Sequence, residues 1–174
     1  VLTLNLSQSG IFAGVTVTYE DDNLVFRFNG YNTSLSGTVI VLDPGHGMTS
    51  SGKIDPGGVG HITDQYVGQV ISKQLESKLR ALGATVYRLP TESQFIDTEQ
   101  RAAVARQYKP DIFISIHGNK ASASSARGVE AWYFTPWSQP LASSVSSSVG
   151  QYFASNIYAD GKNSNRGAKY NVFW

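Results

Sequence analysis

From residue 38 onward, the sequence alternates short apolar runs with longer amphipathic segments, and this alternation restricts the possible folds more than any other feature. Thr38–Leu42 (TVIVL) is a continuous run of mostly β-branched residues, which is typical of a buried parallel strand. Between residues 63 and 82, apolar residues recur at steps of three and four, which predicts an amphipathic helix. Gly83 follows this segment, at the place where a left-handed helix C-cap is expected.

The same alternation continues through the rest of the chain. Further strands are predicted at Ala84–Leu89, Asp111–Ile116 and Val129–Phe134, and further helices at Asp97–Tyr108 and Ser138–Tyr158. The last helix carries an apolar stripe that includes Val145 and Val149, and a serine-rich face opposite to it. Repeated strand–helix–strand units predict an α/β fold with a mostly parallel sheet and helices on both faces.

The first 37 residues follow a different pattern. Val15–Tyr19 and Leu24–Phe28 each alternate apolar with polar residues, and the turn-forming residues Glu20–Asn23 separate them. This arrangement predicts a β-hairpin. Tyr31–Gly37 is rich in Ser, Thr, Asn and Gly and is expected to form a linker. We therefore divide the chain into residues 1–37 and residues 38–174.

The composition argues against several classes of protein for this chain. Fourteen Lys and Arg residues against thirteen Asp and Glu residues give a net charge of +1, without the basic cluster that nucleic-acid binding requires. The chain has no cysteine, which excludes disulfides and thiolate metal sites. No apolar run approaches the length of a bilayer span, and the start at Val1 resembles neither a signal peptide nor an initiator methionine. A mature product or a fragment is expected.

Two histidines occupy equivalent places in this pattern. His46 follows the first parallel strand within DPGHG, and His117 ends a later strand within SIHGN. Ligand sites in open α/β sheets gather at the carboxyl ends of the strands, so the two imidazoles are expected to converge. The glycines beside each histidine allow backbone and ligand to approach closely. A metal or catalytic site at this edge of the sheet is the interpretation that the pattern favours.

A pair of imidazoles suits zinc, and a catalytic zinc takes three protein ligands and keeps one position for water. Asp64 lies in the first turn of the helix that follows the His46 loop, where it can face the same edge of the sheet. It could equally be a helix N-terminal charge, with Thr63 as the cap. His61 is the alternative third ligand.

Two other kinds of site are disfavoured. Gly52–Gly60 is rich in glycine but lacks both the P-loop spacing and a GxGxxG pattern after a strand, so a phosphate cradle is not expected. A serine hydrolase would need a GxSxG turn to expose its nucleophile, and the chain has none. Metal-assisted hydrolysis is therefore the predicted class of reaction.

At these residues the sequence resembles the zinc-dependent N-acetylmuramoyl-L-alanine amidases of bacterial autolysins and sporulation lysins. The matching segments are VIVLDPGHG (39–47), DPGGVG (55–60), Arg101, DIFISIHGN (111–119) and NRGAK (165–169). The resemblance implies one Zn²⁺ held by His, Glu and His, with His46 and His117 as the two histidines. It further implies hydrolysis of the amide between N-acetylmuramic acid and L-alanine in peptidoglycan, and hence a secreted protein of the cell wall.

The chain departs from this family in two places. Asp64 stands where the family has a glutamate, so its shorter stem must be offset by the backbone. The family's general-base glutamate belongs to a late strand, and it is expected beyond Trp174. Glu130 matches another family glutamate and is the candidate substitute for that base, or else a surface carboxylate. Asn119 and Arg166 are candidates for substrate binding, or for holding their loops.

The resemblance also bears on the organisation of the chain. The hairpin resembles the end of the β-rich modules that precede such domains, so residues 1–37 are expected to be a remnant of one. Residues 38–174 would be the amidase catalytic domain, truncated at its C-terminus, and a monomeric part of a longer protein. Two alternatives stay open: a degenerate domain that binds wall peptide or a partner without cleaving it, and a metallohydrolase of another amide.

Overall fold

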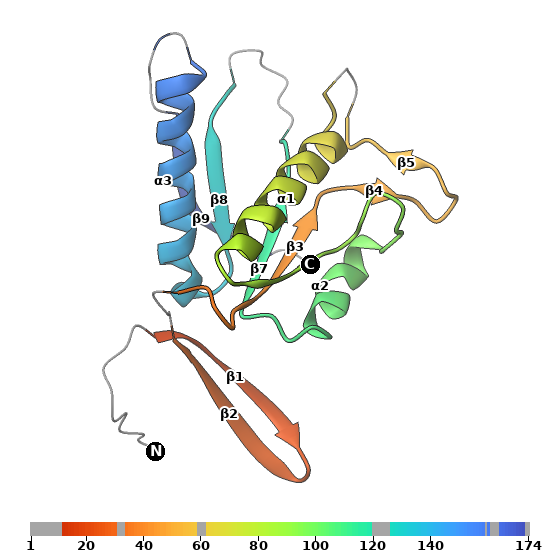
Figure 1. Ribbon diagram of the computed structural model, residues 1–174, viewed down its shortest axis with the longest axis vertical. Helices are drawn as coiled ribbons and strands as arrows, with labels where there is room; N and C mark the ends of the chain where they lie inside the picture. The colour runs from red at the N-terminus through yellow and green to blue at the C-terminus, as the bar shows by residue number, and fades with distance from the viewer. Residues whose placement is uncertain are drawn as a thin grey trace. The chain divides into compact units, whose positions relative to one another are not determined.

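The computed structural model describes residues 12–30, 34–58, 62–119, 126–158, 160 and 164–172. Contacts within the chain define two compact units, and Figure 1 shows the elements of both. One unit combines Val1–Tyr31 with Ser122–Trp174, and the other spans Asn32–Ala121. The division of the chain at residue 37 stays a prediction. Among the described residues, no helix is both long and apolar enough to cross a membrane.

The unit of residues 32–121 is built on a three-stranded parallel sheet. β3 (Val39–Pro44) lies in the centre, between β6 (Thr85–Arg88) and β7 (Ile112–Ile116). Ile40 is paired with Val86 on one side and with Ile112 on the other. Because all three strands run in the same direction, their carboxyl ends meet at one edge of the sheet. The predicted α/β fold with a parallel sheet is confirmed.

Helix α1 (Asp64–Ala81) covers one face of this sheet. Its leucines Leu75 and Leu79 pack against Ile40, Leu42 and Val86, all of which are at most 2% exposed. Burying side chains of this size contributes roughly 1.5–3 kcal/mol each, so this contact is the main apolar core of the unit.

Local signals fix both ends of α1. The Thr63 hydroxyl accepts a hydrogen bond from the Tyr66 backbone N–H at 3.2 Å, as expected of a helix N-cap. At the other end Gly83 adopts a left-handed conformation with φ +95°, and its N–H donates to the Arg80 carbonyl. The predicted helix and its C-cap are confirmed.

Helix α2 (Thr98–Arg106) lies on the opposite side of the sheet. The Asp97 side chain caps it by accepting from the Glu99 N–H. Arg101 of α2 reaches Asp43, whereas α1 packs against Leu42. Because neighbouring side chains of a strand point to opposite faces, the two helices lie on opposite sides of β3.

A small hairpin that the sequence pattern did not predict extends from the end of β3. β4 (Gly47–Met48) pairs antiparallel with β5 (Ile54–Asp55). Strands of two residues cannot show the alternation from which strands are predicted. The pairing is important for the site because it sets Asp55 directly opposite Gly47, the neighbour of His46.

In the other unit, the predicted N-terminal hairpin is confirmed. β1 (Phe12–Glu20) and β2 (Asn23–Gly30) pair antiparallel, with Val17 opposite Phe26. Asp21 and Asp22 both have positive φ, at 48° and 62°, which is the turn geometry that suits the twist of a two-residue hairpin.

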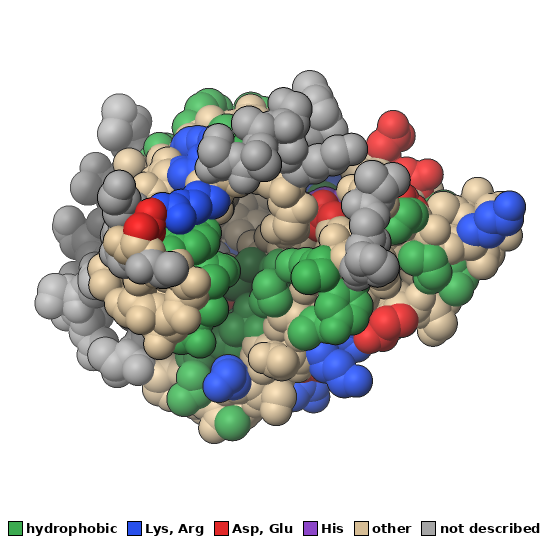
Figure 2. Space-filling view, turned by 90° about the horizontal axis from the view of Figure 1, so that it is seen from above, with side chains coloured by type: hydrophobic (Ala, Val, Ile, Leu, Met, Phe, Trp, Pro, Cys, Tyr) green, Lys and Arg blue, Asp and Glu red, His purple; other side chains and the backbone are tan. Residues whose placement is uncertain are grey.

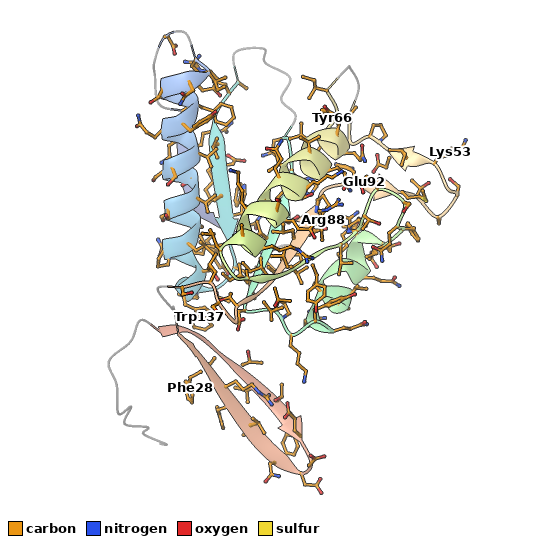
Figure 3. All side chains as sticks on the ribbon, in the orientation of Figure 1. Phe28, Lys53, Tyr66, Arg88, Glu92 and Trp137 are labelled. Carbon is orange, nitrogen blue, oxygen red and sulfur yellow. The ribbon has the colours of Figure 1, made fainter. Side chains whose placement is uncertain are left out.

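The hairpin contacts the short 3₁₀ helix η1 (Pro136–Ser138) through Trp137, which Figure 3 shows beside the start of β1. A β-carbon on Gly14 would lie 2.7 Å from the Trp137 Nε1 atom, so only glycine leaves room for this indole. Phe28, on the same side of the hairpin as Val15, is 46% exposed. The apolar face that Val15 and Phe28 share therefore stays partly exposed.

The same unit contains β8 (Val129–Tyr133), which pairs parallel with β9 (Asn165–Tyr170), and helix α3 (Gln139–Asn156), which packs on both strands. Strand β9 was not predicted, because NRGAKY is polar and contains a glycine with positive φ.

The predicted last helix is confirmed as α3. Its buried residues are small ones at four-residue steps: Ala142, Ser146, Gly150 and Ala154. Val145 and Val149 remain 42% and 37% exposed. Small side chains let a helix approach a sheet closely, so the stripe of larger residues did not mark the face that packs on β8 and β9.

The chain has nearly equal numbers of basic and acidic residues, so side chains of both charges are expected on the surface. On the face shown in Figure 2, Lys and Arg side chains of the described residues lie among acidic, apolar and neutral ones.

Candidate metal centre

Three side chains meet at the carboxyl edge of the parallel sheet. His46 follows β3, His117 follows β7, and Asp64 is the first residue of α1. One nitrogen of each histidine and one carboxylate oxygen of Asp64 all lie within 4.8 Å of one another. The Asp64 Oδ2 atom is 3.1 Å from Nε2 of His46 and 3.0 Å from Nδ1 of His117. The convergence expected from the sequence is thus observed in the geometry.

The carboxylate of Asp64 is held by its other oxygen. Oδ1 accepts a hydrogen bond of 2.7 Å from the backbone N–H of Gly118, so Oδ2 is directed towards the two histidines. Burial raises the pKa of Asp64, but the hydrogen bonds from Gly118 and His117 outweigh it, and the pKa lies below its ordinary value. Asp64 is therefore an ionised carboxylate with one oxygen available to a cation.

A second carboxylate orients His46. The Nδ1 atom of His46 is 2.8 Å from Oδ2 of Asp55, and Oδ1 of Asp55 accepts from the Gly57 N–H at 3.0 Å. The hydrogen bond with His46 is the main reason why the pKa of Asp55 is lowered. The hydrogen bond between Nδ1 and Asp55 fixes the orientation of the ring and directs Nε2 towards Asp64. Histidines that bind metals are commonly fixed in this way.

Glycines make room for both imidazole rings. A β-carbon on Gly45 would lie 2.5 Å from the Nδ1 and Cε1 atoms of His117, and one on Gly57 would overlap the ring of His46. Gly68 in α1 faces the backbone, with its β-carbon position 3.0 Å from the Gly45 nitrogen. The absence of side chains at these positions lets the first turns of α1 and both rings share one small volume.

The remaining candidates are not among the three residues that meet at the sheet edge. Asn119 follows Gly118 in the same unit, while Glu130 and Arg166 belong to β8 and β9 of the other unit. His61 lies outside the described residues.

Glu130 takes part in an ion-pair cluster. Its carboxylate lies 2.6 Å from Nζ of Lys169 and 3.3 Å from Nε of Arg166, and Trp132 donates to it through Nε1 at 3.3 Å. The hydrogen bond from Lys169 is the main cause that lowers the pKa of Glu130. The structure thus joins two residues that the sequence analysis had selected separately, Glu130 and Arg166.

This lowered pKa leads to a prediction about stability. The ion pairs of Glu130 stabilise the fold above the unfolded-state pKa of about 4.3, and their contribution is lost as the pH falls through the lower folded-state pKa. Glu130→Gln should therefore lower the free energy of unfolding by about 1 kcal/mol at neutral pH and by much less in acid. Urea unfolding at several pH values measures this difference. Glu20→Gln, which breaks the more exposed pair with Arg27, is the control with a smaller expected effect.

Two contributors to the site were not predicted from the sequence. Asp55 was noted only as part of a matching segment, although its place two residues before a glycine with positive φ indicates a turn that can present a carboxylate. The Gly118 amide could not be found from residue types, because any residue supplies a backbone N–H.

Comparison with known proteins identifies the class. Residues 40–174 match the family model of N-acetylmuramoyl-L-alanine amidase. The chain therefore belongs to the N-acetylmuramoyl-L-alanine amidase family, and the resemblance found in the sequence is confirmed.

Two curated relatives illustrate the range of similarity. The amidase AmiC of Neisseria meningitidis serogroup B is 39% identical over 90 residues, which are 52% of this chain and 21% of AmiC. The amidase LytC of Bacillus subtilis is 29% identical over 129 residues, which are 74% of this chain and 25% of LytC. The chain thus spans a quarter or less of the length of these relatives.

Solved structures of amidases share the fold. The amidase of Clostridium difficile 630 superimposes with a TM-score of 0.64 at 26% identity, over 80% of this chain and 72% of that one. The catalytic domain of CwlV from Bacillus (Paenibacillus) polymyxa gives a TM-score of 0.60 at 25% identity, over 78% and 71% of the two chains.

Proposed function

We propose that this chain carries the metal centre of a peptidoglycan amidase, which hydrolyses the amide between N-acetylmuramic acid and the L-alanine of the stem peptide. The observation that carries the proposal is the meeting of His46, Asp64 and His117 at one edge of the sheet. Membership of the amidase family supports the choice of substrate. The protein would act in the cell wall, as a secreted monomeric part of a longer protein.

The donor set fits zinc. Two imidazole nitrogens and one carboxylate oxygen are three ligands of the kind that a catalytic zinc takes, with a further position left for water or substrate. Asp64 can replace the family's glutamate because its Oδ2 atom already lies near both histidines. When bound, the zinc would polarise the amide carbonyl and lower the pKa of a water molecule.

The residues around the ligands hold them in a state ready to bind. Asp55 forms a hydrogen bond with Nδ1 of His46, and Gly118 donates to Asp64 so that the carboxylate keeps one fixed orientation. Such partners raise the basicity of the ligands and remove their rotational freedom before the metal arrives.

Glu130 is a poor candidate for the general base. A general base works best with a pKa near the operating pH, and Lys169 holds the pKa of Glu130 below its ordinary value. Of the two roles considered for Glu130, we therefore propose the structural one. Asn119 and Arg166 stay as proposed contacts for the stem peptide.

The test is to measure zinc and activity together. The purified chain should contain one zinc per molecule by elemental analysis, and the zinc should be lost in a His46→Ala/His117→Ala double variant. Release of the stem peptide from purified muropeptides measures the activity. Zinc binding without cleavage would fit a domain that binds wall peptide without hydrolysing it, and equally an amidase whose general base is not among these residues. A chain without zinc would overturn the metal centre.

A further inference from the structure

The backbone of His46 adopts an unusual conformation. Its φ is +60°, in the left-handed region that L-residues other than Asn, Asp and His rarely enter. Such a conformation persists only when the surroundings hold it, and it determines where the imidazole points. A group outside the loop that binds the His46 backbone would stabilise this conformation.

Arg101 of α2 is the group that contacts it. Its Nη1 donates to Oδ1 of Asp43 at 2.8 Å and to the Pro44 carbonyl at 2.9 Å, and its Nη2 donates to the His46 carbonyl at 2.5 Å. One guanidinium thus spans the segment from the end of β3 to the proposed ligand. Asp43 also accepts from the Ser115 hydroxyl at 2.7 Å, which ties the network to the strand that carries His117.

The burial of Arg101 indicates that these hydrogen bonds hold its side chain in place. Its side chain is only 12% exposed, and its buried Nε atom has no hydrogen-bond partner within the described part of the chain. Leaving a buried donor unpaired is unfavourable, so the contacts made by Nη1 and Nη2 must outweigh that loss. A lysine could keep the charge beside Asp43, but it lacks the planar fork that reaches both carbonyl oxygens.

We propose that Arg101 is a positioning residue for the metal centre: it fixes the left-handed backbone of His46, and through it the direction of the Nε2 atom, and so determines the affinity for zinc. This inference rests on the proposed function, because it assigns a role toward the same site. Arg101 itself touches neither metal nor substrate.

The expected result is a loss of affinity that depends on the side chain. Arg101→Met should weaken zinc binding by roughly 10- to 100-fold, as is usual when a partner of a metal ligand is removed. Arg101→Lys should lie between this variant and the parent, because it keeps only the pairing with Asp43. Competition of the metal-free protein with a chromogenic chelator for Zn²⁺ measures all three affinities.

Arg88 provides a matched control. Its side chain is 11% exposed, and its guanidinium pairs with Glu76 at 3.2 Å and with Glu92 at 3.4 Å. Arg88 and Glu92 are labelled in Figure 3. No contact between Arg88 and the His46 loop is found among the described residues. Arg88→Met should therefore lower the unfolding temperature as Arg101→Met does, and leave the zinc affinity unchanged.

A spectroscopic readout on the metal-free protein separates positioning from stability. In the parent and in Arg88→Met, nitrogen-15 NMR of the histidine side chains should show one His46 signal set. In Arg101→Met this set should broaden or split, because the loop samples other backbone conformations.

The outcomes are distinct. If Arg101→Met loses stability but keeps both the zinc affinity and the single His46 signal set, the inference is overturned and Arg101 only supports the fold. If the parent chain itself takes up no zinc, the proposed function fails instead, and the His46 signals of the metal-free proteins alone decide whether Arg101 positions this residue.

Discussion

Asp64→Asn is expected to lower the zinc affinity by roughly 100- to 1,000-fold while the fold stays intact. Zinc sites with four ligands bind with about 10–16 kcal/mol, so one ligand contributes about 2.5–4 kcal/mol. Asparagine has the shape of aspartate and can still accept the Gly118 N–H through its oxygen. Its NH₂ group then faces His46 and His117, and a donor cannot coordinate a cation.

The measurement is a titration of the metal-free protein with Zn²⁺ against a chelator, beside a thermal unfolding curve. Asp111→Asn is the matched control, because Asp111 also accepts a backbone N–H, that of Val39 at 2.8 Å, but lies at the opposite end of β7. Asp64→Glu should stay within about tenfold of the parent, since it keeps the charge and only lengthens the stem. If Asp64→Asn binds zinc as the parent does, Asp64 is not a ligand, and His61 becomes the first alternative to test.

The elements that the sequence predicted are those whose signals are local. The Thr63 cap, the spacing of Leu75 and Leu79, and Gly83 at the end define α1 without reference to the rest of the chain. The strands β4 and β5 have no such signal, because two residues carry no periodicity and their pairing depends on the course of the loop between them.

Helix α3 shows that an apolar stripe can predict a helix without predicting the face that packs. The periodicity of Val145 and Val149 predicted the helix, but the contacts with β8 and β9 are made by the small residues beside them. A hydrophobic pattern reports which residues avoid water, and close approach between backbones depends instead on which residues are small.

In the candidate metal centre, too, only part of the arrangement could be predicted from the sequence. His46 and His117 could be paired from the sequence because the rule that joins them, the shared carboxyl edge of parallel strands, needs only the order of the elements. The role of Arg101 could not be read in this way. It depends on the left-handed φ of His46 and on which carbonyl oxygens α2 faces, and both are properties of the folded backbone.

Gly45→Ala should damage the centre without removing any ligand. The added β-carbon would lie 2.5 Å from Nδ1 and Cε1 of His117, closer than such atoms can approach, so the ring or the loop must move. Movement of the ring displaces the Nδ1 atom that now lies 3.0 Å from Oδ2 of Asp64, and movement of the loop displaces the neighbouring His46. We expect the zinc affinity to fall by roughly 100-fold and the free energy of unfolding by about 1–3 kcal/mol.

Gly58→Ala separates this steric effect from the general effect of replacing a glycine. Neither Gly45 nor Gly58 has a positive φ, and a β-carbon on Gly58 meets no atom within 4 Å among the described residues. Gly58→Ala should therefore keep the zinc affinity of the parent. Should Gly45→Ala bind zinc as tightly as Gly58→Ala does, the ring of His117 can leave its place without cost to the metal. In that case Nδ1 of His117 is not a ligand, and the centre must be completed by another residue.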